Sequence, residues 1–222
     1  VSLSVAERAN IRMLRGHMVF GPHVLLPQPT TYFTVLRDPI ERVISHYYHV
    51  RRDANHHHHN FLVSNDMDLK AYVESGVHLG MSDFQTRVLA GGEWHNAPYG
   101  ECPGEALNVV KENFRKHFAV VGLVERFDET LLLLRRAFGW RDIFSVPQNV
   151  SRHRPDKHEL EPETLKAIVD VNRIDIKLYE HVKERFDQAV RRLGPEFARE
   201  VWAFRLLNRG FASLSYGKGK VG

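Results

Sequence analysis

The sequence lacks the features that mark disulfide-rich and membrane-spanning proteins. It contains a single cysteine, Cys102, so no disulfide can form within the chain, and we expect a reducing compartment. It has no run of about 18 apolar residues, which excludes a membrane-spanning helix among these residues. The first residues also lack the charged-then-apolar order of a signal peptide. These absences predict a cytoplasmic protein; the alternative is the Golgi lumen, if a membrane anchor precedes Val1.

Features of nucleic-acid-binding proteins are also scarce. The 31 basic residues nearly balance the 27 acidic ones, which leaves a net charge of +4, and most of them are interleaved along predicted helices. There is no zinc-finger spacing, no aromatic RNA-binding signature and no heptad repeat. We therefore expect no nucleic-acid partner. Because the pI is basic, salt-dependent binding to duplex nucleic acid remains an alternative hypothesis. Phosphonucleotides and acidic sugars suit the small positive charge.

The hydrophobic residues, 43% of the sequence, suffice for the core of one domain over residues 1–222. Apolar periodicity predicts buried strands at 31–36 and 118–123. Capping residues and helical periodicity predict helices at 39–52, 66–76, 82–92, 105–117, 127–138 and 162–193. A helical extension at 195–216 is expected to pack on the domain or on a second subunit, so a homodimer is possible, and 217–222 is expected to be a disordered tail.

The most informative stretch is the junction between the strand at 31–36 and the helix at 39–52. Asp38 suits the position that caps the helix, and Pro39 suits its first residue. Arg37 therefore lies at the carboxyl end of the strand, where ligands of open α/β sheets bind and where free helix N–H groups favour anions. Ser45 lies two turns into the helix, so its hydroxyl and the Arg37 guanidinium can converge on one phosphate.

The run Leu-Arg-Asp-Pro-Ile-Glu-Arg-Val-Ile-Ser-His-Tyr-Tyr resembles the 3′-phosphate-binding element of carbohydrate sulfotransferases that use 3′-phosphoadenosine 5′-phosphosulfate (PAPS), especially the heparan-sulfate 2-O-sulfotransferase group. The segment Phe118-Ala-Val-Val-Gly-Leu-Val-Glu-Arg-Phe-Asp is similar to a core segment of the same family. The resemblance covers about residues 14–190. It implies a three-layer α/β/α fold of the phosphate-loop nucleotide-binding type with a short parallel sheet, in which Arg37 and Ser45 hold the 3′-phosphate of PAPS.

Arg15-Gly16-His17 resembles the Gly-His segment that supplies the catalytic base in this family. The resemblance implies that His17 deprotonates a carbohydrate hydroxyl while the sulfuryl group is transferred to it. An imidazole suits this task because its ordinary pKa lies near neutral pH. Without the resemblance, His17 is more simply a histidine at the end of a loop.

Two further segments resemble parts of the family's binding site. The loop 146–155 is similar to the one that closes over PAPS, which makes Ser151 and Arg154 candidate cofactor ligands, or members of a solvated loop. The segment Gln85-Thr-Arg87 resembles one beside the acceptor groove, so Gln85 and Arg87 are candidate substrate contacts. Alternatively, they form the polar face of a helix.

One part of the family's pattern does not occur in these residues. The family carries a phosphate loop, roughly Pro-Lys-Thr-Gly-Gly-Thr-Ser, that holds the 5′-phosphosulfate. Val1–Arg15 instead has the pattern of a helix end or linker. There are three alternatives: the loop has been lost, another chain supplies it, or the fold is a remnant. Without the loop, sulfuryl transfer would be crippled. The alternative function is therefore a non-catalytic module that binds phosphonucleotides or polyanions.

Four consecutive histidines, residues 56–59, stand in a polar loop. Adjacent residues rarely place several imidazoles around one ion, and no cysteine or carboxylate cluster follows at ligand spacing. We therefore interpret the run as a solvated insertion and expect no metal cofactor. A metal site remains the alternative for the run. His46 and His49 are expected on a half-exposed helix surface, or else on a face that contacts the substrate.

Overall fold

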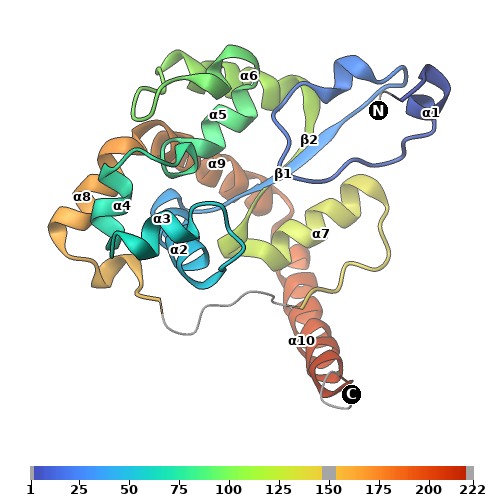
Figure 1. The fold of residues 1–222 in the computed structure, drawn as a ribbon. Helices are drawn as coiled ribbons and strands as arrows, with labels where there is room; N and C mark the ends of the chain where they lie inside the picture. The colour runs from blue at the N-terminus through green and yellow to red at the C-terminus, as the bar shows by residue number, and fades with distance from the viewer. Residues whose placement is uncertain (1–2, 147–153, 219–222) are drawn as a thin grey trace.

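The structure, a computed structural model, describes residues 3–146 and 154–218, with side chains described up to residue 211 (Figure 1). Its helices and strands occur in the order α1 (Val5–Ala9), β1 (Tyr32–Leu36), α2 (Pro39–Arg52), α3 (His59–Ser64), α4 (Leu69–Glu74), α5 (Phe84–Ala90), α6 (Glu105–His117), β2 (Phe118–Leu123), α7 (Phe127–Phe138), α8 (Pro162–Val171), α9 (Arg173–Arg192) and α10 (Gly194–Lys218). Short 3-10 turns lie between them at η1 (Pro22–Leu25), η2 (Leu79–Met81), η3 (Gly92–Asn96), η4 (Val124–Arg126) and η5 (Lys157–Glu159).

The two strands of the described residues form a short parallel sheet, which confirms that part of the predicted fold. β1 pairs with β2 in a register that sets Leu36 opposite Leu123. A parallel pair needs a long crossover, and here it contains helices α2 to α6. The carboxyl ends of both strands therefore lie at the same edge of the sheet, with Arg37 directly after β1.

Side chains on the two faces of the strands pack against different helices. The ring of Phe33 contacts Phe138, the last residue of α7, and Trp140, two residues after it. The ring centroids are 5.7 and 5.5 Å from that of Phe33. Leu36 and Leu123, on the other face, join a cluster with residues of α5, α6 and α9. The alternation of a strand thus covers both faces with helices.

Gly122 allows α7 to approach β2 closely. A Cβ atom at this position would overlap the side chain of Thr130 on α7. The Thr130 hydroxyl accepts from the Leu123 backbone N–H at 3.0 Å and lies 3.1 Å from the Leu123 carbonyl oxygen. The Val-Gly-Leu segment therefore has the architectural role that the sequence predicted.

A second core lies under α2. Its apolar stripe packs on α3, α4 and α8, as the periodicity of residues 39–52 predicted. The fully or nearly fully buried members of this core are Val43, Ile44, Tyr47, Val50, Leu62, Leu69, Tyr72, Val73, Met81 and Ile168. This packing holds the first turns of α2 firmly beside the sheet.

The single helix predicted at 162–193 is wrong, because the chain breaks at Asn172 into α8 and α9. The Asn172 amide nitrogen donates to the carbonyl oxygens of Met81 at 2.8 Å and Ile168 at 2.9 Å. Its side-chain oxygen accepts from the Asp83 backbone N–H at 3.1 Å. These tertiary bonds favour the break over a continuous helix.

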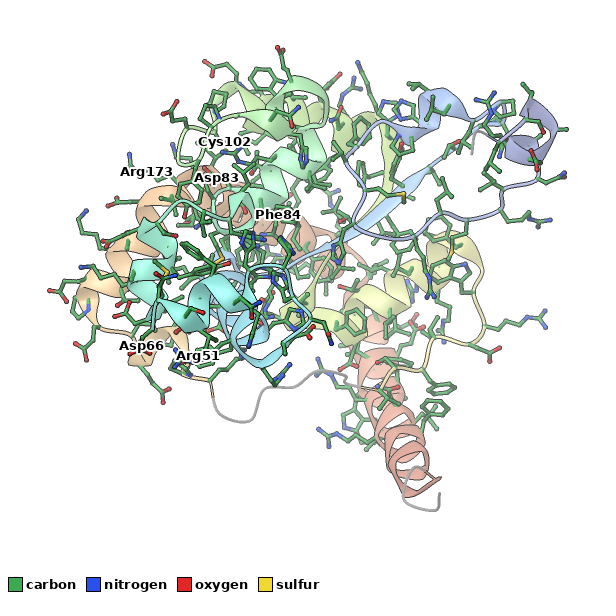
Figure 2. All side chains as sticks on the ribbon, in the orientation of Figure 1. Arg51, Asp66, Asp83, Phe84, Cys102 and Arg173 are labelled. Carbon is green, nitrogen blue, oxygen red and sulfur yellow. The ribbon has the colours of Figure 1, made fainter. Side chains whose placement is uncertain are left out.

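Two buried aspartates join α5 to α9 by capping each other's helix. Asp83 accepts from the backbone N–H groups of Ile174 and Asp175 at 2.9 and 2.8 Å, and Asp175 accepts from those of Gln85 and Thr86 at 3.0 and 2.7 Å. Figure 2 shows Asp83 and Phe84 at the start of α5. Burial, and then the nearby Asp175, raise the pKa of Asp83 to about 7.

The C-terminal helix α10 begins on the body of the molecule and then projects from it (Figure 1). Phe197, Val201 and Phe204 are buried against α7, whereas Trp202 remains 66% exposed. The predicted homodimer remains a prediction. Residues 219–222 of the predicted tail lie outside the described residues. None of the helices in the described part of the chain combines the length and apolar character needed to cross a membrane.

Candidate active site

A pocket of about 530 Å³ opens beside the carboxyl end of β1. Three of the predicted site residues line it together, namely His17, Arg37 and Ser45. A second hollow, of about 920 Å³, shares His17, Arg37, Arg42 and Phe84 with the first. The two therefore adjoin, and residues from distant parts of the sequence meet at their common wall.

Arg37 stands in a cluster of charges with Glu41 and Arg154. Its guanidinium lies 3.9 Å from the Glu41 carboxylate, to which Arg154 donates at 2.8 Å. Burial and the nearby Arg154 charge lower the pKa of Arg37 from its ordinary value. Two guanidinium groups share the Glu41 carboxylate, so each keeps donors that can bind an anion.

The first turn of α2 offers fewer free N–H groups than the sequence suggested. The Asp38 carboxylate accepts from the N–H groups of Ile40 and Glu41 at 3.0 and 3.2 Å, and Pro39 has none. Lys157, at the start of η5, donates to Asp38 at 2.6 Å. The predicted contribution of free helix N–H groups to anion binding is therefore wrong for these two positions, and side chains must supply it.

Glu125 fixes the same junction from the end of β2. It accepts from the Asp38 backbone N–H at 2.9 Å and from the Tyr179 hydroxyl at 2.8 Å. These bonds give Glu125 a structural role at the junction of the two strands with α2 and α9.

Gln85 positions Arg37 through the backbone. Its side-chain oxygen accepts from the Arg37 N–H and its amide nitrogen donates to the Arg37 carbonyl, both at 2.9 Å. Gln85 also lines the larger hollow. The Gln85 amide thus fixes the backbone of Arg37, which belongs to the charge cluster of Arg37, Glu41 and Arg154.

Arg87 is placed differently from the other predicted residues. It is 1% exposed, and its guanidinium donates to the carbonyl oxygens of Ala97 and Pro98. In this arrangement Arg87 holds the loop 91–104 in place, and it does not line either of the two pockets. Ser151, predicted as a cofactor ligand, lies outside the described residues.

Arg42 is a site residue that the sequence analysis missed. Its Nε and Nη2 atoms are buried and have no hydrogen-bond partner within the described part of the chain, although the guanidinium stacks over the Phe84 ring at 5.4 Å. Burial lowers the pKa of Arg42, and the carboxylates of Asp175 and Asp83 oppose this effect. No sequence pattern marks Arg42, because its burial depends on tertiary packing against residues such as Phe84.

The donors around the pocket fit an anionic group. Buried guanidinium nitrogens without partners are rare, because each loses its hydration without compensation. A phosphate or sulfate group would supply acceptors for Arg42 and Arg37 in a geometry that suits a planar fork of donors.

His17 lies in the irregular segment before η1 and lines both pockets. The segment is tied to the body of the molecule because the Phe20 N–H donates to the Val88 carbonyl on α5 at 2.8 Å. Gln28 also bonds the carbonyl oxygens of Arg8 and Ile11, each at 3.0 Å. His17 itself is exposed, so its imidazole is accessible to a substrate in the pocket.

Histidines form the remaining wall of the smaller pocket. His46, His49, His56 and His78 all line it. Burial and the neighbouring His78 lower the pKa of His46 to about 3, and burial and His58 lower the pKa of His78 to about 4. The imidazoles of His46 and His78 are therefore neutral at neutral pH.

The four-histidine run packs against this wall. His56 and His58 are half-buried beside His78, with ring centroids 6.0 and 4.4 Å from it, while His57 is exposed. The interpretation of the run as a purely solvated insertion is wrong for these two residues, because both rings pack against His78, a contact that depends on tertiary structure.

Comparison with known proteins shows the family of the chain. A family model described as galactose-3-O-sulfotransferase matches residues 3–221, so the chain belongs to this family of carbohydrate sulfotransferases. This confirms the resemblance to carbohydrate sulfotransferases.

The similar curated proteins include two kinds of carbohydrate sulfotransferase. Galactose-3-O-sulfotransferase 3 of Mus musculus is 30% identical over 198 residues, which cover 82% of this chain and 44% of the relative. Galactose-3-O-sulfotransferase 2 of Homo sapiens is 26% identical over 220 residues, covering 95% of this chain and 54% of the relative. Uronyl 2-sulfotransferase of Homo sapiens is 24% identical over 222 residues, covering 87% and 52%. The chain thus spans about half the length of the curated relatives it matches.

Proposed function

We propose that the protein transfers a sulfuryl group from PAPS to a hydroxyl of a carbohydrate. The observation that carries this proposal is the meeting of His17, Arg37 and Ser45 at one pocket, in a chain that belongs to a carbohydrate sulfotransferase family. The relatives are named for galactose and uronyl acceptors. We propose a hydroxyl of one of these sugar classes as the acceptor.

Arg37 and Ser45 are proposed to bind the 3′-phosphate of PAPS. Arg37 supplies a charged fork of donors and Ser45 one hydroxyl, and Gln85 fixes the backbone that carries Arg37. Arg154 forms an ion pair with Glu41, which also lies near Arg37, and it adds positive charge. Ser151 remains a proposed ligand of the same group. Arg42 is proposed to meet a further anionic group in the larger hollow.

His17 is proposed as the general base. PAPS supplies the sulfuryl group, and its product is 3′-phosphoadenosine 5′-phosphate (PAP). As the acceptor oxygen forms its bond to sulfur, the bond between sulfur and the oxygen of the 5′-phosphate breaks, and His17 takes the proton of the acceptor hydroxyl. Protonated His17 then returns to its neutral form by loss of this proton to solvent.

The wider architecture is also part of the proposal. Helices on both faces of a short parallel sheet support a three-layer α/β/α fold of the phosphate-loop type. The compartment remains a prediction from the lone cysteine: cytoplasm, with the Golgi lumen as the alternative.

Replacing Arg37 tests the cofactor site. Arg37→Ala is expected to weaken binding of PAP about tenfold to a hundredfold, because a hydrogen bond to a charged group contributes about 1.5–3 kcal/mol and Arg37 is partly exposed. Isothermal titration calorimetry of the whole chain measures the change.

The matched control is Arg115→Ala, which removes an exposed arginine of α6 that pairs with Glu112. This variant is expected to bind PAP as the unchanged protein does. Equal affinities of Arg37→Ala and the unchanged protein would remove Arg37 from the site.

A further inference from the structure

Three histidines far apart in the sequence converge at the wall of the smaller pocket. His46 lies on α2, His56 lies in the loop before α3, and His78 directly precedes η2. One ring nitrogen of each lies within 4.8 Å of the corresponding nitrogens of the other two. The ring centroids of His46 and His78 are 4.7 Å apart, and those of His46 and His56 are 5.5 Å apart.

The backbone is arranged to hold the His78 ring in this place. A Cβ atom at Gly80 would overlap the ring, so only glycine leaves room for it to fold back over η2. His46 is fixed because the adjoining turns of α2 are anchored in the second core by Val43, Ile44 and Tyr47. The wall is therefore formed mainly by rigid elements, to which the loop adds His56.

Two nitrogens of the cluster have unmet bonding capacity. Nε2 of His46 and Nδ1 of His78 are buried and lack a hydrogen-bond partner within the described residues. A buried nitrogen atom without a partner costs free energy, and such atoms call for a ligand. Two imidazole nitrogens that both present lone pairs cannot form a hydrogen bond with each other. One metal cation, in contrast, can accept the lone pairs of all three nitrogens.

We propose that His46, His56 and His78 bind one divalent transition-metal ion of the type of Zn²⁺. Imidazole suits Zn²⁺, Cu²⁺ and Ni²⁺, whereas Mg²⁺ and Ca²⁺ require oxygen ligands that this cluster does not contain. Zn–N bonds are about 2.0–2.1 Å long, so the three nitrogens would move closer together as they bind the ion.

His46, His56 and His78 all line the pocket that His17, Arg37 and Ser45 also line, so an ion bound to them would be accessible from this pocket. Three protein ligands with one open position form an arrangement in which water or an anion completes the coordination. The exposed His57 and the half-buried His58 form a second set with His78, which offers alternative ligands from the four-histidine run. His78 is common to both sets, so it is the residue on which the site depends.

Metal titration of the whole metal-free chain tests this proposal. We expect one tightly bound equivalent of Zn²⁺ by calorimetry, and one equivalent of Co²⁺ with the visible absorption of a tetrahedral ion. His78→Ala and His46→Ala are each expected to weaken this binding about tenfold or more. Circular dichroism of the metal-free variants verifies that both are folded.

Two control variants distinguish metal binding at the three-histidine site from nonspecific metal binding by exposed histidines. His59→Ala removes a member of the run whose Nδ1 bonds the Val50 carbonyl oxygen at 2.9 Å, and His158→Ala removes an exposed histidine of η5. Both are expected to bind as the unchanged chain does. If His46→Ala and His78→Ala also keep the full affinity, or if the unchanged chain binds no equivalent, the proposal is overturned.

Discussion

His17→Ala is expected to lower the turnover of sulfuryl transfer about 10²- to 10⁴-fold, the range for loss of a general base. The exposed imidazole of His17 borders the pocket, and its removal leaves no proposed acceptor for the hydroxyl proton. Because His17 is not proposed to contact the 3′-phosphate, the affinity for PAP is expected to remain within about twofold. Transfer of radiolabelled sulfuryl from PAPS to a galactoside by the full-length protein measures turnover.

The control is His158→Ala, which removes another exposed histidine and is expected to leave turnover unchanged. Turnover that survives in His17→Ala would show that another group takes the proton. A full-length protein that binds PAP but transfers nothing to galactosides or uronyl sugars would instead favour a non-catalytic binding module.

Asp175→Ala is expected to lower the free energy of unfolding by about 3 kcal/mol or more. Asp175 is fully buried and accepts from the Gln85 N–H, the Thr86 N–H and the Thr86 hydroxyl. Alanine would leave these buried donors unpaired, and each such loss costs about 1–3 kcal/mol. Urea denaturation followed by circular dichroism measures the change.

A matched aspartate stands on the neighbouring helix. Asp170 lies on the surface of α8 and pairs with Lys166 and Arg173, so Asp170→Ala is expected to leave the urea midpoint almost unchanged. Similar urea midpoints for the two variants would contradict the structural role of the buried aspartates.

The elements that the sequence predicted well carry their signals locally. β1, α2 and α6 follow from apolar periodicity and from capping residues such as Asp38, whose carboxylate caps α2 in the structure. The break at Asn172 could not be predicted, because it depends on bonds to Met81 and Asp83 across the fold.

The same distinction applies to the candidate site. Arg37 and Ser45 are eight positions apart at one strand–helix junction, so their meeting at one pocket could be predicted from that junction. The burial of Arg87 depends on the carbonyl oxygens of a distant loop. The histidine wall likewise depends on tertiary structure, which brings His78 beside His46 and His56.

The central claim is that this pocket binds the 3′-phosphate of PAPS. Titration of the chain with PAP and with adenosine 5′-monophosphate tests it most directly, because the two nucleotides differ only in that phosphate. Our account predicts that PAP binds about tenfold more tightly or better, since charged hydrogen bonds to the 3′-phosphate contribute about 1.5 kcal/mol or more. Equal affinities for the two nucleotides, or no binding of PAP, would contradict it.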